Sequence, residues 1–127
     1  MTNVLIIEDE ARMREVMIML LSDLPIKVFE AADGDQAVDL FDNENIHLVI
    51  TDLKLPKRGG MEVLKHIKES RPEVPVIIVT AFGSIDNAVT AIRESAFDYV
   101  TKPFKEERLQ SCVKKALQIS TLTYEVK

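Results

Sequence analysis

The sequence predicts an open, doubly wound α/β domain, and three observations support this prediction. Short runs rich in Val and Ile alternate along the chain with longer stretches whose apolar residues lie three and four apart, which is typical of strands taking turns with helices. Several of the short runs show no polar alternation, as expected for parallel strands that helices cover on both faces. The total of 127 residues suits one such domain with a real hydrophobic core.

Five short runs are expected to form a central parallel sheet, with five helical stretches between and after them. The strands are predicted at residues 4–7, 28–31, 48–51, 76–80 and 99–101. The apolar stripes of the helices span residues 13–21, 37–41, 61–67, 85–92 and 109–117. Turn residues separate the elements, since Asp33-Gly34, Arg58-Gly59-Gly60 and Gly83-Ser84 each precede a predicted helix. Short links of this kind imply right-handed crossovers and helices on both faces of the sheet.

Composition and charge exclude several classes of protein. A hydrophobic share of 46% and a charged share of 29% are typical of a folded globule and argue against disorder. The net charge of -5 leaves no basic surface for phosphates, so direct nucleic-acid binding by this segment is not expected. Cys112 is the only cysteine, which excludes an internal disulfide and a Cys-based zinc site and suits a reducing cytoplasm. No apolar run is long enough to cross a bilayer, and no signal stretch opens the chain, so neither membrane insertion nor export is expected.

Polar residues stand at the carboxyl ends of four predicted strands, where open α/β sheets hold their ligands. The five residues are Glu8, Asp9, Asp52, Thr80 and Lys102. Taken singly, each has an ordinary explanation as a cap, a strand residue or a solvated charge. The predicted topology gathers all five at one edge of the sheet, and this juxtaposition favours a functional site.

Three carboxylates at that edge, Glu8, Asp9 and Asp52, repel one another unless a proton or a cation relieves the repulsion. Oxygen ligands without a nearby His or Cys indicate Mg²⁺, or Mn²⁺ in its place. His47 and His66 do not contribute, because one precedes the third strand and the other lies inside the third helix. The sequence therefore predicts a divalent metal site.

A metal beside a carboxylate, a lysine and a hydroxyl suits phosphoryl chemistry. The carboxylate attacks, the metal and the ammonium offset charge on the phosphoryl oxygens, and the hydroxyl donates a hydrogen bond. Asp52 is the strongest candidate nucleophile because it stands alone after the middle strand of the sequence, whereas Glu8 and Asp9 are adjacent and better placed to share the metal.

These residues resemble the receiver domain of two-component response regulators over residues 4–119. The likeness joins four motifs, VLIIEDE at 4–10, VITDLKLP at 49–56 with a Gly pair at 59–60, VTA at 79–81 and YVTKPF at 99–104. It implies a flavodoxin-like (CheY-like) five-stranded parallel sheet with strand order 2-1-3-4-5 and five helices.

The resemblance also implies a role for each site residue. The residue matched by Asp52 accepts a phosphoryl group from a phosphohistidine on a partner sensor kinase. Glu8 and Asp9 match the acidic pair that serves the metal, and the main-chain carbonyl of Lys54 would complete the protein ligands. Lys102 matches the lysine that contacts the phosphoryl group.

The same family supplies expectations for a conformational switch. Thr80 and Tyr99 match its switch pair, in which the hydroxyl moves toward the phosphoryl group and the ring turns inward. This change remodels the face made by the fourth and fifth strands and helices, which then controls self-association or an output domain. The bond between Lys102 and Pro103 is cis in that family, whereas an X-Pro bond is otherwise expected to be trans.

One stretch resembles a subfamily. Residues 80–89 and 96–99 look like receivers of sigma-54-dependent activators of the NtrC kind, which are transcriptional regulators. On this interpretation residues 1–119 form the receiver, and residues 120–127, which lack an apolar stripe, form a tail or the start of a linker to an absent output domain.

Three alternatives remain open at this point. An aspartyl-phosphate phosphatase of the haloacid dehalogenase type would need an Asp-x-Asp motif after the first strand, which Glu8-Asp9 does not supply. A flavodoxin-like flavin-binding module would need a Ser/Thr/Gly-rich phosphate loop there. A receiver that acts only by binding partners, without phosphorylation, is disfavoured by the intact site residues.

Overall fold

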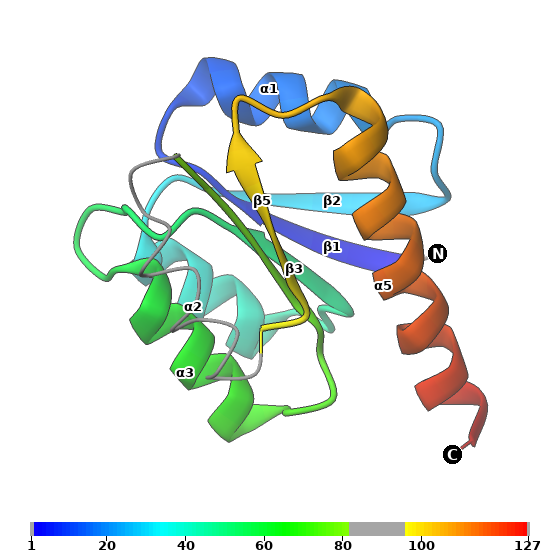
Figure 1. Cartoon of the computed structure of the whole chain (residues 1–127). Coiled ribbons are helices and arrows are strands. Elements are labelled where there is room, and N and C mark those ends of the chain that lie inside the picture. The colour runs from blue at the N-terminus through cyan, green and yellow to red at the C-terminus, as the bar shows by residue number, and fades with distance from the viewer. Residues whose placement is uncertain (1, 82–95, 127) are drawn as a thin grey trace.

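The computed structural model describes residues 2–81 and 96–126, with side chains up to residue 119. Five parallel strands form one sheet in the order β2-β1-β3-β4-β5, which confirms the predicted topology. The strands are β1 (Thr2–Ile7), β2 (Ile26–Ala31), β3 (Leu48–Thr51), β4 (Val76–Ala81) and β5 (Asp98–Lys102). The order places β2 and β5 at the two edges of the sheet (Figure 1).

Four helices lie in the described part of the chain, namely α1 (Ala11–Leu20), α2 (Gly34–Asn43), α3 (Gly60–Ser70) and α5 (Glu106–Val126). The helix predicted around residues 85–92 lies outside the described residues. As Figure 1 shows, α2 and α3 cover one face of the sheet, while α1 and α5 cover the other. A two-faced arrangement of this kind explains why the strands read as apolar runs without polar alternation.

The core consists of two apolar layers, one on each face of the sheet. Neighbouring residues of a strand point to opposite faces, so Leu5 and Ile7 pack toward α2 and α3, whereas Val4 and Ile6 pack toward α1 and α5. Cys112 belongs to the second layer, is 1% exposed and is a free thiol. The packed core therefore fixes the positions of the carboxyl ends of the strands.

The observed elements extend beyond several predicted boundaries. The edge strand β2 begins at Ile26 instead of residue 28, and β5 includes Asp98 and Lys102 at its ends. The backbone of α5 continues to Val126, so a helix runs through most of the segment expected as a tail or linker. Main-chain hydrogen bonding defines these ends, and an apolar stripe in the sequence does not report it.

In the part of the chain that the structure describes, no helix is both long and apolar enough to cross a bilayer.

His47 is expected to make the stability of the domain fall as the pH is lowered. Its Nδ1 accepts a hydrogen bond from the main-chain N–H of Asn3 at 2.8 Å, a bond that only the unprotonated nitrogen can accept. Burial and the nearby Arg71 charge lower the pKa of His47 below its ordinary value of 6.5. The unfolded chain then binds a proton first, so the stabilisation is complete above that value and is lost as the pH falls toward the folded-state pKa.

Urea unfolding of the wild type and of His47→Asn at about pH 7.5 and about pH 5.5 tests this expectation. The wild type should lose more stability between the two conditions than the variant. An equal loss in both proteins would show that His47 does not carry the pH dependence.

Candidate functional site

The predicted site residues lie at the carboxyl edge of the sheet. Glu8 and Asp9 follow β1, and Asp52 follows β3 directly. Thr80 is the next-to-last residue of β4, and Lys102 is the last residue of β5. Four strands thus deliver the five residues to one edge, as expected from parallel pairing.

Lys102 lies between two acidic side chains that the sequence places far from it. Its ammonium donates a hydrogen bond to Asp52 Oδ2 at 2.7 Å and a short one to Glu8 Oε1. Glu8 is only 2% exposed and Asp52 8%, so both carboxylates are largely removed from water. The structure therefore brings together Glu8, Asp52 and Lys102 in one charged cluster.

The electrostatics of this cluster depend on the balance between burial and ion pairing. Burial raises the pKa of the Glu8 carboxyl, and this effect outweighs the hydrogen bond from Lys102, which lowers it. Burial alone would lower the pKa of Lys102, but its hydrogen bonds with Asp52 and Glu8 outweigh burial and raise it. The ammonium thus stays charged and is the counter-charge of two buried carboxyl groups.

Main-chain contacts fix the position of Asp52. Its N–H donates to the carbonyl of Ile7 at 3.2 Å, which ties it to the end of β1. Its Oδ1 accepts the N–H of Lys54 at 3.0 Å, and the hydroxyl of Thr51 donates to its carbonyl at 2.9 Å. This contact involves the N–H group of Lys54 and not its carbonyl. The role of the Lys54 carbonyl as a metal ligand therefore stays a prediction.

Two glycines allow helices to approach the loop that follows Asp52. A Cβ atom on Gly60 would lie 2.2 Å from the carbonyl oxygen of Asp52, and one on Gly34 would lie 1.9 Å from the carbonyl oxygen of Arg58. In addition, the N–H of Gly60 donates to Leu53 at 3.0 Å. The start of α3 and the start of α2 therefore hold this loop from two sides, a role that exceeds the helix-start signal these glycines carry in the sequence.

Thr80 and Asp9 differ in their surroundings. Thr80 is 2% exposed, and its buried hydroxyl finds no hydrogen-bond partner among the described residues. A buried hydroxyl without a partner is costly, and such a group calls for an explanation. Asp9 is exposed, in contrast to its neighbour Glu8.

Tyr99 lies on the edge strand β5 and is half-buried against the core layer that faces α2 and α3. The peptide bond between Lys102 and Pro103 is cis. The cis bond is the one that the resemblance implied, and the switch role of Tyr99 stays a prediction.

The donor set at this edge consists of carboxylate and main-chain oxygens, which are the ligands that a hard cation such as Mg²⁺ prefers. Within the described ranges, however, no three His, Cys, Asp or Glu side chains come close enough together to hold a metal ion. Glu8 and Asp52 contact the Lys102 ammonium instead. The chemistry of the donors fits a divalent cation, and their grouping into a metal site remains a prediction.

Arg14 is a contact residue that sequence reasoning missed. Its guanidinium donates to the main-chain carbonyl of Glu8 at 2.7 Å and pairs with the Glu30 carboxylate at 3.0 Å. It therefore ties α1 and β2 to the peptide that joins Glu8 to Asp9. No local signal marks it, since a cation on an exposed turn of a predicted helix ordinarily means a solvated side chain.

A doubly wound sheet of this order, with a buried acid and a lysine in contact at its carboxyl edge, defines a receiver-type α/β domain. The family model described as "Response regulator receiver domain" matches residues 4–114. The chain belongs to this family, whose members are signalling domains of two-component systems.

Curated relatives support the assignment. The chain is 34% identical over 115 residues to the response regulator protein PilR of Pseudomonas aeruginosa, covering 91% of this chain and 26% of PilR. It is 34% identical over 127 residues to the regulatory protein AtoC of Escherichia coli, covering 98% of this chain and 27% of AtoC. The chain thus spans about a quarter of the length of these two relatives.

Solved structures agree in fold. The signal receiver domain of a LuxO protein from Vibrio parahaemolyticus matches with a TM-score of 0.93 at 32% identity, covering 99% of this chain and 97% of that one. NtrX from Brucella abortus matches with a TM-score of 0.90 at 35% identity, covering 99% of this chain and 29% of NtrX. Membership in a signalling family favours a switch over the phosphatase and flavin-binding alternatives.

Proposed function

We propose that this chain is a phosphorylation-activated switch in which Asp52 accepts a phosphoryl group from a phosphohistidine of a sensor histidine kinase. The contact of Asp52 with Lys102 at 2.7 Å carries this proposal, because it pairs a nucleophile with a fixed cation at the carboxyl edge of the sheet. The hydroxyl of Thr80, which has no hydrogen-bond partner among the described residues, adds a donor at the same edge.

The proposed transfer moves the phosphoryl group from a nitrogen of the donor to an oxygen of Asp52. A carboxylate oxygen of Asp52 attacks phosphorus, an O–P bond forms, the N–P bond to the donor imidazole breaks, and the imidazole leaves with the electron pair of that bond. The ammonium of Lys102 offsets negative charge on the phosphoryl oxygens, and the hydroxyl of Thr80 donates a hydrogen bond to one of them. Because Lys54 and Ile7 hold Asp52 through the main chain, the nucleophile needs little rearrangement.

Mg²⁺, or Mn²⁺ in its place, is the proposed cofactor. Glu8, Asp9, Asp52 and the main-chain carbonyl of Lys54 would hold it. When bound, the metal supplies charge neutralisation at the phosphoryl oxygens. The buried Glu8 and the exposed Asp9 have different duties in this proposal, since Glu8 also orients Lys102.

Thr80 and Tyr99 form the proposed switch. The hydroxyl of Thr80 gains a partner when the phosphoryl group arrives, and Tyr99 rearranges on the neighbouring edge strand, changing the face made by β5 and α5. A swing from 1:99 to 99:1 in favour of the active arrangement requires about 5.5 kcal/mol of differential stabilisation. The roughly one and a half to two negative charges that a phosphoryl group adds must supply it.

The changed face would control dimerisation or an output domain. The likeness to PilR, AtoC, LuxO and NtrX favours a transcriptional output of the sigma-54-dependent kind, in which a different segment contacts DNA. We place this activity in the cytoplasm, where the free thiol of Cys112 is stable.

Intact mass spectrometry tests the central step. The wild type, treated with a small phosphodonor such as acetyl phosphate and Mg²⁺, should gain the mass of one phosphoryl group. Asp52→Asn should gain none, and Asp9→Asn should gain less at the same Mg²⁺ concentration. Absence of the added mass on the wild type, or equal labelling of Asp52→Asn, would overturn the proposal.

A further inference from the structure

The edge strand β5 has an unusual support on its open side. Among the described strands it pairs with β4 only, with Tyr99 level with Ile78, so alternate main-chain groups of β5 point away from the sheet without a partner in a described strand. Both outward groups of Tyr99 are held by charged side chains. Its N–H donates to Asp98 Oδ1 at 2.7 Å, and its carbonyl accepts from Arg108 Nη2 at 2.8 Å.

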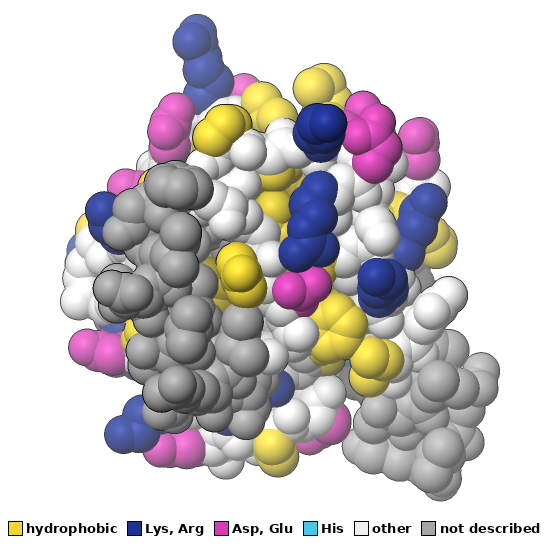
Figure 2. Space-filling model, in the orientation of Figure 1, with side chains coloured by type: hydrophobic (Ala, Val, Ile, Leu, Met, Phe, Trp, Pro, Cys, Tyr) yellow, Lys and Arg dark blue, Asp and Glu magenta, His cyan; other side chains and the backbone are white. Residues whose placement is uncertain are grey.

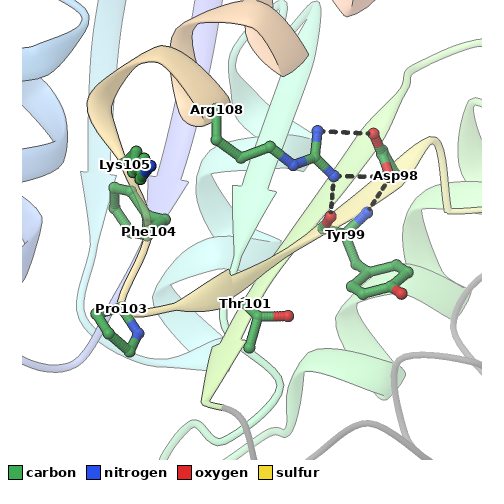
Figure 3. A pocket seen from close by; sticks show the side chains of 7 residues that line it. All are labelled: Asp98, Tyr99, Thr101, Pro103, Phe104, Lys105 and Arg108. Carbon is green, nitrogen blue, oxygen red and sulfur yellow. Dashed lines mark hydrogen bonds and ion pairs between the residues drawn. The ribbon is translucent and has the colours of Figure 1, made fainter.

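Arg108 and Asp98 also contact each other, which closes a ring around the Tyr99 main chain. The guanidinium of Arg108 lies 3.4 Å and 3.5 Å from the two Asp98 carboxylate oxygens. Figure 3 shows this closed set of contacts between α5 and the start of β5. At these distances and with this exposure the ion pair itself contributes little, so the bond to the Tyr99 carbonyl carries most of the connection.

A second α5 residue joins the same carboxylate. Cys112 lies one helical turn after Arg108, and its thiol donates to Asp98 Oδ2 at 3.6 Å. Burial, followed by the Asp98 charge, raises the pKa of this thiol to about 12, so it remains a protonated donor at neutral pH. Asp98 is thus linked to α5 at two successive turns.

The ring of Tyr99 lies on the face of the sheet opposite to α5. It packs against the core layer on the α2 and α3 side, whereas Cys112 belongs to the layer on the α1 and α5 side. One residue of the edge strand therefore connects both layers, its ring to one and its main chain, through Arg108, to the helix of the other. A shift of the ring would therefore reach α5 through two links, the main chain of Tyr99 and the side chain of Arg108.

Asp98, Tyr99 and Arg108 also border an open pocket of about 590 Å³. The other residues that line it are Thr101, Pro103, Phe104 and Lys105. Figure 2 shows basic side chains gathered on this face of the molecule with an acidic side chain among them. Arg108 is 46% exposed on its side chain, so a substitution there leaves the core undisturbed.

We propose that Arg108 is a positioning residue that couples Tyr99 to α5, so that the rearrangement of Tyr99 on phosphorylation is transmitted to the first turns of that helix. The inference rests on the proposed switch function. It assigns to Arg108 no part in the chemistry at Asp52, since the side-chain bonds of Arg108 to described residues go to Asp98 and Tyr99 at the start of β5.

The first test uses the unphosphorylated protein and amide hydrogen exchange. In Arg108→Met, the Tyr99 amide should exchange about tenfold faster than in the wild type, because loss of the bond from Arg108 to the Tyr99 carbonyl loosens this end of the edge strand. Lys114→Met removes the same charge from the same helix without a contact to β5 and should leave this amide unchanged. Unchanged exchange at Tyr99 in Arg108→Met, or an equal rise in Lys114→Met, overturns the coupling.

The second test follows main-chain amide resonances of α5 residues 106–112 by NMR as acetyl phosphate and Mg²⁺ are added. Arg108→Met should be phosphorylated as fast as the wild type, within about twofold, while its α5 shift changes fall to about half or less. Arg108→Lys, which keeps a positively charged donor group, should recover part of these shift changes.

Normal phosphorylation of Arg108→Met with α5 shifts of wild-type size refutes this inference and leaves the proposed function standing. Absence of phosphorylation in the wild type refutes the proposed function, and the exchange test then still decides whether Arg108 positions Tyr99.

Discussion

Lys102→Met is expected to lower the free energy of unfolding by about 3 kcal/mol at neutral pH and to reduce phosphorylation of Asp52 about a hundredfold. The loss of stability follows from leaving Glu8 and Asp52 buried without their counter-charge. Protonation of a glutamate with an ordinary pKa of 4.5 costs about 3.4 kcal/mol at pH 7, which limits the penalty from Glu8, because the carboxyl can take up a proton instead. Urea unfolding and intact mass after phosphodonor treatment measure the two effects.

The pH dependence of this variant gives an independent check. Burial raises the folded-state pKa of Glu8, so its protonated form is favoured in the folded chain, and without Lys102 this preference grows. The associated stability is present below the unfolded value of 4.5 and is lost as the pH rises through the raised folded-state pKa. Lys102→Met should therefore be closest to the wild type near about pH 5 and weakest at neutral pH.

A second-site change separates charge from packing. Adding Glu8→Gln to Lys102→Met removes one uncompensated carboxylate at nearly constant volume and should restore part of the lost stability at neutral pH. A double variant that is no more stable than Lys102→Met would show that packing of the lysine stem, instead of charge, carries the effect.

Gly60→Ala is expected to destabilise the domain by about 3 kcal/mol, at the upper end of the usual cost of overpacking. The added Cβ would lie 2.2 Å from the Asp52 carbonyl oxygen and 2.6 Å from the Leu53 Cα, and both are main-chain atoms that cannot rotate away. Either α3 or the loop that follows Asp52 must shift. Because a shift of the loop moves Asp52 away from Lys102, the rate of phosphorylation should fall together with stability.

The adjacent glycine is the matched control for this change. A Cβ on Gly59 would meet only the Leu53 carbonyl oxygen at an ordinary 3.7 Å, and its φ of -70° is accessible to alanine. Gly59→Ala should change the free energy of unfolding by less than about 1 kcal/mol, since the loss of a favourable N-cap and the reduced entropy of the unfolded chain oppose each other. If the two variants unfold at the same urea concentration, the close approach at Gly60 is not what constrains this loop.

The sequence was sufficient for the sheet and for the site residues at its edge. Apolar runs such as residues 48–51 lack polar alternation because helices cover both faces, and this pattern is visible without coordinates. The motifs around Asp52 and Lys102 then indicated a receiver, and the family match over residues 4–114 confirmed it. The phosphoryl, metal and switch roles of these residues remain predictions that the experiments above test.

Two side chain to main-chain contacts could not be predicted from the sequence. Arg14 looks like any exposed helix cation, yet it holds the carbonyl of Glu8. Arg108 likewise looks like a surface charge in the first turn of a helix, yet it bonds the main chain of Tyr99. Side chain to main-chain bonds of this kind depend on where a carbonyl lies in space, and hydrophobic periodicity carries no information about that.

By itself the sequence determined the class of fold, the order of its elements and the set of polar residues at the ends of the strands, because periodicity and turn chemistry are local properties of the chain. Only the tertiary structure decided that Lys102 contacts both Glu8 and Asp52, which lie 94 and 50 positions away from it. It also decided that Glu8 is buried while Asp9 is exposed, and that α3 meets the Asp52 main chain at Gly60. These contacts join residues from different strands and helices, so they exist only once the sheet has set the distances between the strand ends.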